Sequence, residues 1–329
     1  MNITVIGAGA IGGHIAGKLA AAGESVKVVA RGEHLKAIRE RGLKLKENGE
    51  EIVARVEATD RIADAGGADL IVLGVKAHQL APIAADVASI VSPSTTIMTT
   101  QNGIPWWYFF KHGGRYEGVR LESVDPGGLI ASHLPIDTVV AAISYQAAEI
   151  ESPGVIRHIE GHRLPVAEID GRKTDRIAAL SELFTKAGFK SPALSDVRSE
   201  IWMKLWGNLT FNPVSALSHA TLEDICRFAP TRALAAAMMR EAQTVGEAFG
   251  IRFRLPIDKR IAGAEAIGHH KTSMLQDIEH GRRTEIDALL GSVIELARLA
   301  NVATPHLDAV YAATKLLGET VVRSGGDKS

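Results

Sequence analysis

The chain has 329 residues, which is more than one hydrophobic core usually serves, so two domains are expected. Hydrophobic residues make up 46% and charged residues 23% of the chain, an ordinary globular composition that excludes general disorder. The 37 basic and 38 acidic residues leave a net charge of -1, which argues against a nucleic-acid binder, and the single cysteine, Cys226, excludes an internal disulfide and a cysteine-rich metal site.

The first half of the chain alternates short apolar runs with helical patterns. We predict strands at residues 3–6, 26–29, 69–75 and 95–99, a helix at residues 11–22, later strands at residues 138–147 and 154–159, and a helix at residues 174–187. Alternation of this kind is typical of a parallel sheet that is covered on both faces. We therefore predict an α/β protein with an N-terminal Rossmann-type, doubly wound sheet.

Strand signals end after Ser191 and Pro192. The remaining sequence predicts helices at residues 196–217, 230–249, 273–280, 284–300 and 305–322, and a frayed tail at residues 324–329. We predict a domain boundary near residues 190–195, with a Rossmann-type domain at residues 1–194 and an all-helical C-terminal domain at residues 195–329.

The sequence predicts neither a membrane-spanning helix nor a signal peptide. The longest uncharged stretch, residues 87–110, is rich in Ser, Thr, Gln and Asn and contains two prolines. The N-terminus has neither the basic segment nor the cleavage pattern of a signal peptide. We expect a soluble, cytoplasmic protein.

A glycine-rich turn follows the first predicted strand and leads into the first helix. It consists of Gly7, Ala8, Gly9, Ala10, Ile11 and Gly12. The first glycine allows a tight turn, the second lets a pyrophosphate approach the backbone, and the third lets helix and strand pack closely. The free N–H groups of the helix N-terminus would face the phosphates, so these residues predict a dinucleotide site.

The end of the second strand distinguishes the two nicotinamide dinucleotides. An acidic residue there would bind the ribose 2′-hydroxyl of NAD, whereas an arginine would bind the 2′-phosphate of NADP. This chain has Arg31, and Glu33 comes two residues later. We predict NADP(H) as cofactor, the alternative being that Arg31 is an exposed loop residue.

Two further loops follow strand ends at the same predicted sheet edge. Lys76 follows one strand and would contact ribose or phosphate, or else be a solvated lysine. Asn102 follows another and would place its amide near the nicotinamide, or else form a simple Asn-Gly turn with Gly103.

The helix predicted after residue 196 carries a polar stripe. Lys204, Asn208 and Asn212 are spaced four residues apart, so they share one helix face, and bulky apolar residues flank them. Partly buried polar groups need partners, which a ligand would supply, and a partly desolvated lysine can act as an acid near neutral pH. The alternative is the solvated face of an amphipathic helix.

Residues 271–287 form a second polar segment in the helical half. Ser273 and Thr284 are candidate helix caps, and spacing alone makes Asp277 and Glu285 exposed first-turn acids. The histidines are scattered: His158 and His162 flank Glu160, but His269, His270 and the rest do not converge in any ligand spacing, so we predict no metal site. Cys226 has no base partner in the pattern and is expected to be a small core residue.

Taken together, these motifs resemble the ketopantoate reductase (2-dehydropantoate 2-reductase) family over nearly the whole chain. The resemblance rests on the glycine turn, Arg31, residues 75–77, 101–103 and 201–204, Asn208, Asn212, Pro213 and residues 273–287.

The resemblance implies the reaction and the roles of the residues. It implies NADPH-dependent reduction of a 2-keto acid to a 2-hydroxy acid, with ketopantoate as the leading substrate and pantoate, used in pantothenate and coenzyme A biosynthesis, as product. Lys204 would be the general acid, and Glu285 would hold Lys204 or a substrate hydroxyl. Asn208, Asn212 and Ser273 would bind the substrate's carboxylate and hydroxyl, while Lys76 and Asn102 would line the junction of cofactor and substrate.

Five consecutive aromatic residues, 106–110, depart from the family pattern and predict a lid, a dimer contact or an added hairpin. If they shape the pocket, the substrate is a bulkier or more apolar keto acid.

Two rival functions stay open: a two-domain dehydrogenase of the 3-hydroxyacyl, 6-phosphogluconate or opine kind, and a non-catalytic dinucleotide sensor. We expect no membrane or nucleic-acid partner and consider a homodimer.

Overall fold

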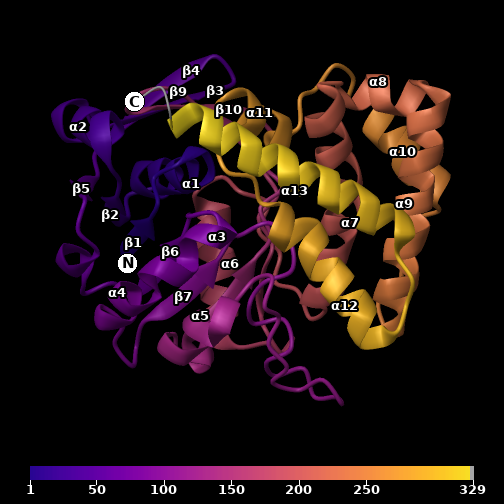
Figure 1. The fold of residues 1–329 in the computed structure, drawn as a ribbon. Coiled ribbons are helices and arrows are strands. Elements are labelled where there is room, and N and C mark those ends of the chain that lie inside the picture. The colour runs from indigo at the N-terminus through magenta and orange to yellow at the C-terminus, as the bar shows by residue number, and fades with distance from the viewer. Residues whose placement is uncertain (327–329) are drawn as a thin grey trace. The chain divides into compact units, whose positions relative to one another are not determined.

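The computed structural model describes residues 1–326, and the chain divides into two compact units. The first unit comprises Met1–Gln101, Pro105–Arg120 and Asp125–Val197, and the second comprises Asn102–Ile104, Leu121–Val124 and the chain from Arg198 onward. Figure 1 shows that every labelled strand precedes helix α7, so the sheets belong to the first unit and the second is helical. The predicted α/β fold with an all-helical C-terminal part is confirmed.

The first unit contains a seven-stranded sheet in the order β11-β8-β7-β6-β1-β2-β5. Its strands are β1 (Asn2–Ile6), β2 (Ser25–Val29), β5 (Glu57–Thr59), β6 (Leu70–Leu73), β7 (Thr96–Thr99), β8 (Val139–Ala142) and β11 (Val166–Glu168). All pairs are parallel except β8 with β11. From β5 to β8 this is the doubly wound dinucleotide-binding order, whose direction reverses between β1 and β6.

The sequence analysis missed most of a second, four-stranded sheet with the order β4-β3-β10-β9. Its strands are β3 (Leu43–Glu47), β4 (Glu50–Ala54), β9 (Ala147–Ser152) and β10 (Val155–Glu160). Of these four strands, only β10 was predicted. Asn48 and Gly49 join β3 to β4 with positive φ angles of 52° and 82°, the conformation that favours Asn-Gly in two-residue hairpins.

Helix α1 (Ala10–Ala21) packs against strands of both sheets: β1 and β2 of the large one and β3, β4, β9 and β10 of the small one. A side chain on Gly17 would overlap Leu45 of β3, so glycine lets the helix approach the small sheet closely. The other helices of this unit are α2 (Gly32–Arg41), η1 (Ile62–Ala65), α3 (Ala77–Leu80), η2 (Ala81–Ile83), α4 (Ala84–Ser89), η3 (Pro126–Gly128), α5 (Leu129–His133), η4 (Ile136–Thr138) and α6 (Asp175–Lys186).

The second unit contains helices α7 (Val197–Ser218), α8 (Leu222–Arg227), α9 (Ala229–Ala248), α10 (Ile257–Glu265), α11 (Ser273–Glu279), η5 (Asp287–Gly291), α12 (Ser292–Ala300) and α13 (Pro305–Gly326). Two of them, α8 and α10, were not predicted. The helix expected at residues 284–300 begins later than predicted, and its first part, η5, is a π-helix. Residues 324–326 belong to α13, and the rest of the tail predicted to fray lies outside the described residues. Within residues 1–326, no helix is both long and apolar enough to cross a bilayer.

The aromatic run at residues 106–110 is largely buried. The side chains of Trp106, Trp107, Tyr108 and Phe109 are at most 4% exposed, and the Trp107 indole donates a hydrogen bond to the Thr99 hydroxyl, 3.0 Å away. This burial favours a packing role over an exposed lid.

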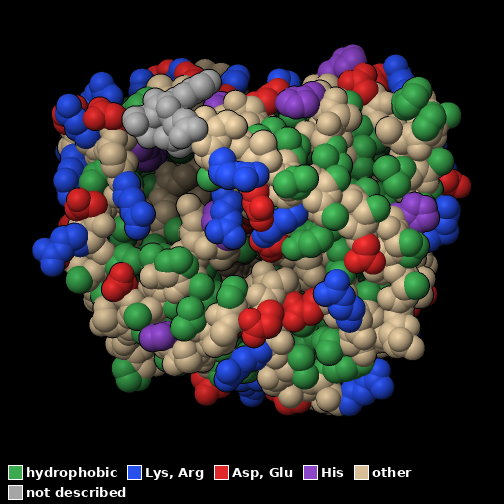
Figure 2. All heavy atoms as spheres, viewed as in Figure 1, with side chains coloured by type: hydrophobic (Ala, Val, Ile, Leu, Met, Phe, Trp, Pro, Cys, Tyr) green, Lys and Arg blue, Asp and Glu red, His purple; other side chains and the backbone are tan. Residues whose placement is uncertain are grey.

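On the face shown in Figure 2, basic and acidic side chains are interspersed, so the part of that face outside the grey residues has no broad area of one charge.

Candidate active site

The glycine turn lies where the order of the large sheet reverses. Gly7 has a φ of +93°, which favours glycine, and a side chain there would lie 2.7 Å from Val75 Cγ1. A side chain on Gly12 would overlap the carbonyl of Gly7, and one on Gly74, after β6, would lie 2.9 Å from the Cα of Gly12. The backbones of turn, helix and neighbouring strand end therefore approach more closely than any larger residue would allow.

The start of α1 fits the phosphates of a dinucleotide. Gly9 is the N-cap residue, and no side chain caps the first turn. No other atom lies within 4 Å of the place where a Cβ of Gly9 would stand, so there is open space beside the turn. A helix start with uncapped N–H groups, positive dipole and open space attracts an anion.

Three predicted positions mark neighbouring strand ends in this unit. Arg31 is exposed and is the N-cap of α2, directly after β2. Lys76 is half-buried and is the N-cap of α3, after β6. Gln101, after β7, donates hydrogen bonds to the carbonyls of Leu73 and Val75 at 3.0 and 3.2 Å, which ties two of these strand ends together.

In the second unit, Lys204, Asn208 and Asn212 lie along one face of α7, as their spacing predicts. Lys204 and Asn208 are half-buried, and Asn212 is buried. The buried Trp206 indole anchors the helix by donating to the Met239 carbonyl of α9 at 2.9 Å. Pro213 lies inside α7 and has no N–H to donate to the preceding turn.

Lys204 and Glu285 are joined through Asn102. The Lys204 ammonium donates to Asn102 Oδ1 at 2.6 Å, and Asn102 Nδ2 donates to Glu285 Oε2 at 3.3 Å. The three residues come from positions 102, 204 and 285 of the chain, so only the fold brings them together. We call Lys204, Asn102 and Glu285 the lysine cluster.

The loop that carries Asn102 is fixed by its backbone. Gly103 has a φ of +90°, and a side chain there would overlap the carbonyl of Ala288 in η5. The next residue, Ile104, donates its N–H to that same carbonyl at 3.0 Å. The backbone of the Asn102-Gly103 loop therefore lies in close contact with the backbone at Ala288.

The charge state of Lys204 suits proton transfer. Burial lowers its pKa to about 8, against the opposing effect of the negative charge of Glu285, which raises it. An ammonium with this pKa is still protonated at neutral pH and gives up its proton more readily than an ordinary lysine.

A network that the sequence analysis did not assign holds the segment after Glu285. Asp287, at the start of η5, accepts hydrogen bonds from the Tyr311 hydroxyl at 2.8 Å and from the Lys315 ammonium at 2.8 and 2.6 Å. These bonds tie η5 to α13. A π-helix is often found at functional sites, and this one lies directly after Glu285.

The remaining predictions for this unit have mixed outcomes. Ser273 is exposed at the first position of α11, and the prediction that it caps the helix is wrong, because Thr272 accepts the N–H of Leu275 at 3.3 Å. Asp277 is buried rather than exposed and lies 3.2 Å from Arg282 Nε. Cys226 is buried, as predicted.

The prediction that no histidines converge is wrong. In the first unit, His14 and His158 meet Glu47, with their ligand atoms within 4.8 Å of one another. The three come from distant parts of the chain, so sequence spacing carried no sign of the cluster.

Comparison with known proteins decides the family. Residues 3–171 match the ketopantoate reductase PanE/ApbA family, and residues 196–318 match its C-terminal domain. The chain belongs to the ketopantoate reductase family. The 2-dehydropantoate 2-reductase of Mesorhizobium japonicum is 49% identical to it over 318 residues, covering 96% of this chain and 98% of the relative.

Solved structures agree with this assignment. The crystal structure of a protein from Ralstonia solanacearum MolK2 is 37% identical, covers 97% of this chain and 98% of its own, and has a TM-score of 0.93. D-mandelate dehydrogenase in its ternary structure with NADH and anilino(oxo)acetate is 23% identical, covers 98% of this chain and 99% of its own, and has a TM-score of 0.82, a likeness that concerns the fold alone.

Proposed function

We propose that this ketopantoate reductase family member reduces 2-dehydropantoate to pantoate with NADPH. The observation that carries the proposal is the lysine cluster, in which a half-buried ammonium is held by an amide that also binds a carboxylate. Such a group supplies the proton that carbonyl reduction needs. A non-catalytic dinucleotide sensor would need neither Lys204 nor Glu285.

Most of the residues assigned to the cofactor belong to the first unit. They are Gly7, Ala8, Gly9, Ala10, Ile11, Gly12, Arg31 and Lys76, and Asn102 of the lysine cluster is assigned to NADPH as well. The uncapped start of α1 and the open space at Gly9 fit a pyrophosphate, and the exposed Arg31 guanidinium fits a 2′-phosphate. When bound, NADPH supplies the hydride for the reduction.

The residues of the second unit would bind the keto acid and control the proton. Asn208, Asn212 and Ser273 would hold the substrate's carboxylate and hydroxyl by hydrogen bonds. Lys204 Nζ would donate a proton to the carbonyl oxygen as negative charge develops there, and it would stabilise that charge more strongly than the neutral ground state.

Asn102 and Glu285 would keep Lys204 ready for this step. The amide oxygen of Asn102 fixes the position of Nζ, and the negative charge of Glu285 limits how far burial lowers the pKa of Lys204. Without that charge, less of the lysine would carry its proton at neutral pH.

The test is a steady-state assay of the purified chain with NADPH or NADH and a panel of 2-keto acids: 2-dehydropantoate, short unbranched acids and acids with an aromatic side chain. We expect the largest kcat/KM for NADPH with 2-dehydropantoate. A clear preference for the aromatic acids would mean that an aromatic keto acid, and not 2-dehydropantoate, is the substrate. NADPH binding without turnover of any acid would favour the dinucleotide sensor. A cytoplasmic location and a homodimer stay predictions.

A further inference from the structure

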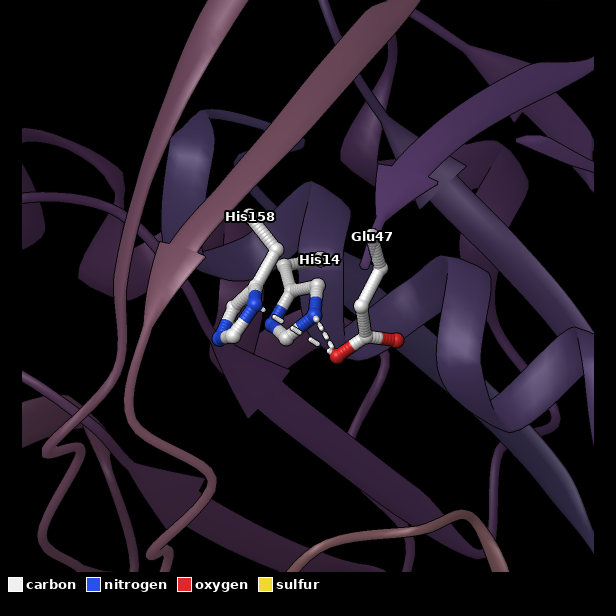
Figure 3. Close-up of side chains that lie close together, drawn as sticks. All are labelled: His14, Glu47 and His158. Carbon is white, nitrogen blue, oxygen red and sulfur yellow. Dashed lines mark ion pairs between the residues drawn. The ribbon is translucent and has the colours of Figure 1, made fainter. Parts of the chain in front are cut away.

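A buried cluster of ionisable side chains lies in the first unit, where α1 packs against the small sheet. Figure 3 shows His14 from α1, His158 from β10 and Glu47 from the end of β3 with their polar atoms turned toward one another. The side chains of His14, His158 and Glu47 are 1%, 3% and 10% exposed. We call these three residues the histidine cluster. The reaction proposed above makes no use of it.

The outer nitrogens of both histidines are already used as donors. His158 Nε2 lies 2.8 Å from the Gly161 carbonyl, which can only accept, so this nitrogen carries a proton. His14 Nδ1 is hydrogen-bonded to Gln146 Oε1, which also accepts. In the neutral rings, the nitrogens that face Glu47 therefore carry lone pairs.

Three acceptors thus face one another. Glu47 Oε1 lies 3.8 Å from His14 Nε2 and 3.5 Å from His158 Nδ1. Among the described residues, neither Glu47 Oε1 nor His14 Nε2 has a hydrogen-bond partner, although both are buried. Buried acceptors without a donor are costly, so the arrangement calls for a cation at its centre.

The other carboxylate oxygen of Glu47 is already paired. The Lys18 ammonium donates a hydrogen bond to Glu47 Oε2 at 2.8 Å. Oε1 is therefore the oxygen that faces the two imidazole nitrogens.

We propose that His14 Nε2, His158 Nδ1 and Glu47 Oε1 bind a divalent transition-metal ion of the Zn²⁺ type. Imidazole nitrogen and carboxylate oxygen are zinc ligands at about 2.0–2.2 Å, which places tetrahedral ligands roughly 3.3–3.5 Å apart. The two distances from Glu47 Oε1 are near this range, and all three ligand atoms lie within 4.8 Å of one another. The imidazole rings are stacked with their centroids 4.7 Å apart, so they would turn toward the ion as it binds. The hydrogen bonds from the outer nitrogens are those that orient metal-bound histidines.

His162 lies next to Glu47 and is partly exposed to solvent. His162 Nδ1 lies 3.3 Å from Glu47 Oε1, and the side chain is 44% exposed. Lys18 occupies Glu47 Oε2, so the carboxylate would bind the ion through one oxygen, and the nearby ammonium lowers the affinity. The ion would cross-link α1, which begins at the glycine turn, to β3 and β10 of the small sheet.

The test is metal binding by the full chain, freed of metal with a chelator and then titrated with Zn²⁺, Co²⁺ or Mg²⁺. We expect one equivalent of Zn²⁺ per chain, a rise of several degrees in Tm at saturating Zn²⁺, and the strong visible absorption of tetrahedral Co²⁺. Mg²⁺ should have no effect, because it prefers oxygen ligands.

Variants locate the site. Glu47→Gln and His158→Gln should lose the Co²⁺ absorption and the Zn²⁺ effect on Tm, while Glu51→Gln, an exposed acid of the same small sheet, should keep both. If His14→Gln fails to fold, the other two variants and the direct titration still decide. Substoichiometric uptake by the wild-type chain, or equal binding by Glu47→Gln and the wild type, would overturn the proposal.

Discussion

The two ionisable clusters, one in each unit, differ in how their donors and acceptors are matched. In the lysine cluster, an ammonium faces an amide oxygen, and the amide nitrogen faces a carboxylate, so each group meets its complement. In the histidine cluster, two imidazole lone pairs and a carboxylate oxygen face one another. The first arrangement contains its cation, whereas in the second the Lys18 ammonium is bonded to the other carboxylate oxygen of Glu47.

The comparison shows that burial alone does not define a site's chemistry. Burial lowers the pKa of both basic groups, to about 8 for Lys204 and to about 4 for His14. Lys204 still holds its proton at pH 7 and can give it to a substrate, while His14 is neutral there and can offer only a lone pair. The same physical cause thus favours proton donation in one place and metal binding in the other.

Removing the cation from the lysine cluster should have the largest effect. Lys204→Ala should lower kcat about 10²–10⁴-fold, the usual contribution of general-acid catalysis. NADPH affinity should change little, because the dinucleotide is assigned to the first unit. Steady-state kinetics at saturating NADPH, with NADPH binding followed by fluorescence, measure the two effects separately.

A further variant separates the release of the proton from the positive charge, and another serves as the control. Lys204→Arg keeps a cation that does not release its proton, so kcat should stay low. Lys259→Ala removes an exposed lysine of α10 and should leave kcat unchanged. Turnover within a few-fold of wild type in Lys204→Ala would remove lysine from the mechanism.

Acid should act on the histidine cluster by supplying protons. The pKa of His14 is 6.5 when unfolded and about 4 when folded, so between these values the unfolded chain binds more protons. The contribution of His14 to stability is therefore complete above pH 6.5 and is lost as pH falls toward 4, by about 3 kcal/mol in all. Urea unfolding of the metal-free protein from pH 8 to pH 4 measures it.

A matched pair of variants isolates the contribution of His14 to the free energy of unfolding. His14→Gln should flatten the pH dependence of the unfolding free energy in this window, and His133→Gln, at an exposed histidine of the same unit, should not. Glu47 acts in the same direction but below pH 4.5, since its folded pKa is lowered. Equal slopes in the wild type and His14→Gln would show that His14 is protonated when folded.

The sequence predicted those parts of the fold whose burial is uniform. Strands β1, β6 and β7 are buried along nearly their whole length, and β2 is interrupted by the half-buried Lys27, so the sequences of these strands together consist mostly of apolar residues. The small sheet was mostly missed because β3 alternates apolar with charged residues and β4 begins with two glutamates, so neither forms a continuous apolar run. The Asn48-Gly49 pair between them was the signal that could have found the hairpin.

The site residues differ in the same way: local spacing predicts where some of them lie, and only the fold brings the others together. The spacing of Lys204, Asn208 and Asn212 places them on one helix face, because a helix relates residues four apart. The contact between Asn102 and Lys204 spans 102 residues, and that between His14 and Gln146 spans 132. Such contacts depend on strand order and helix packing, so local patterns do not contain them.

A third prediction separates cofactor choice from both clusters. Arg31→Ala should raise KM for NADPH about 10- to 100-fold, the worth of a charge-assisted hydrogen bond to the 2′-phosphate, and leave KM for NADH nearly unchanged. Arg41→Ala, at an exposed arginine at the other end of α2, is the control. Equal losses with both cofactors would show that Arg31 does not discriminate between them.

The smallest predicted effect concerns the charge of Glu285. Since Lys204 must be protonated to act, kcat/KM should fall as pH rises through about 8. Glu285→Gln keeps an oxygen that can accept from Asn102 but removes the negative charge that raises the pKa of Lys204. The alkaline limb of the pH profile should therefore move to lower pH, by roughly one unit or less. Glu279→Gln, at an exposed acid of α11 paired with Lys271, should leave the limb in place. Profiles measured from pH 6 to pH 10 distinguish the outcomes: a limb that moves to higher pH, or not at all, would mean that Glu285 acts on the substrate and not on the proton of Lys204.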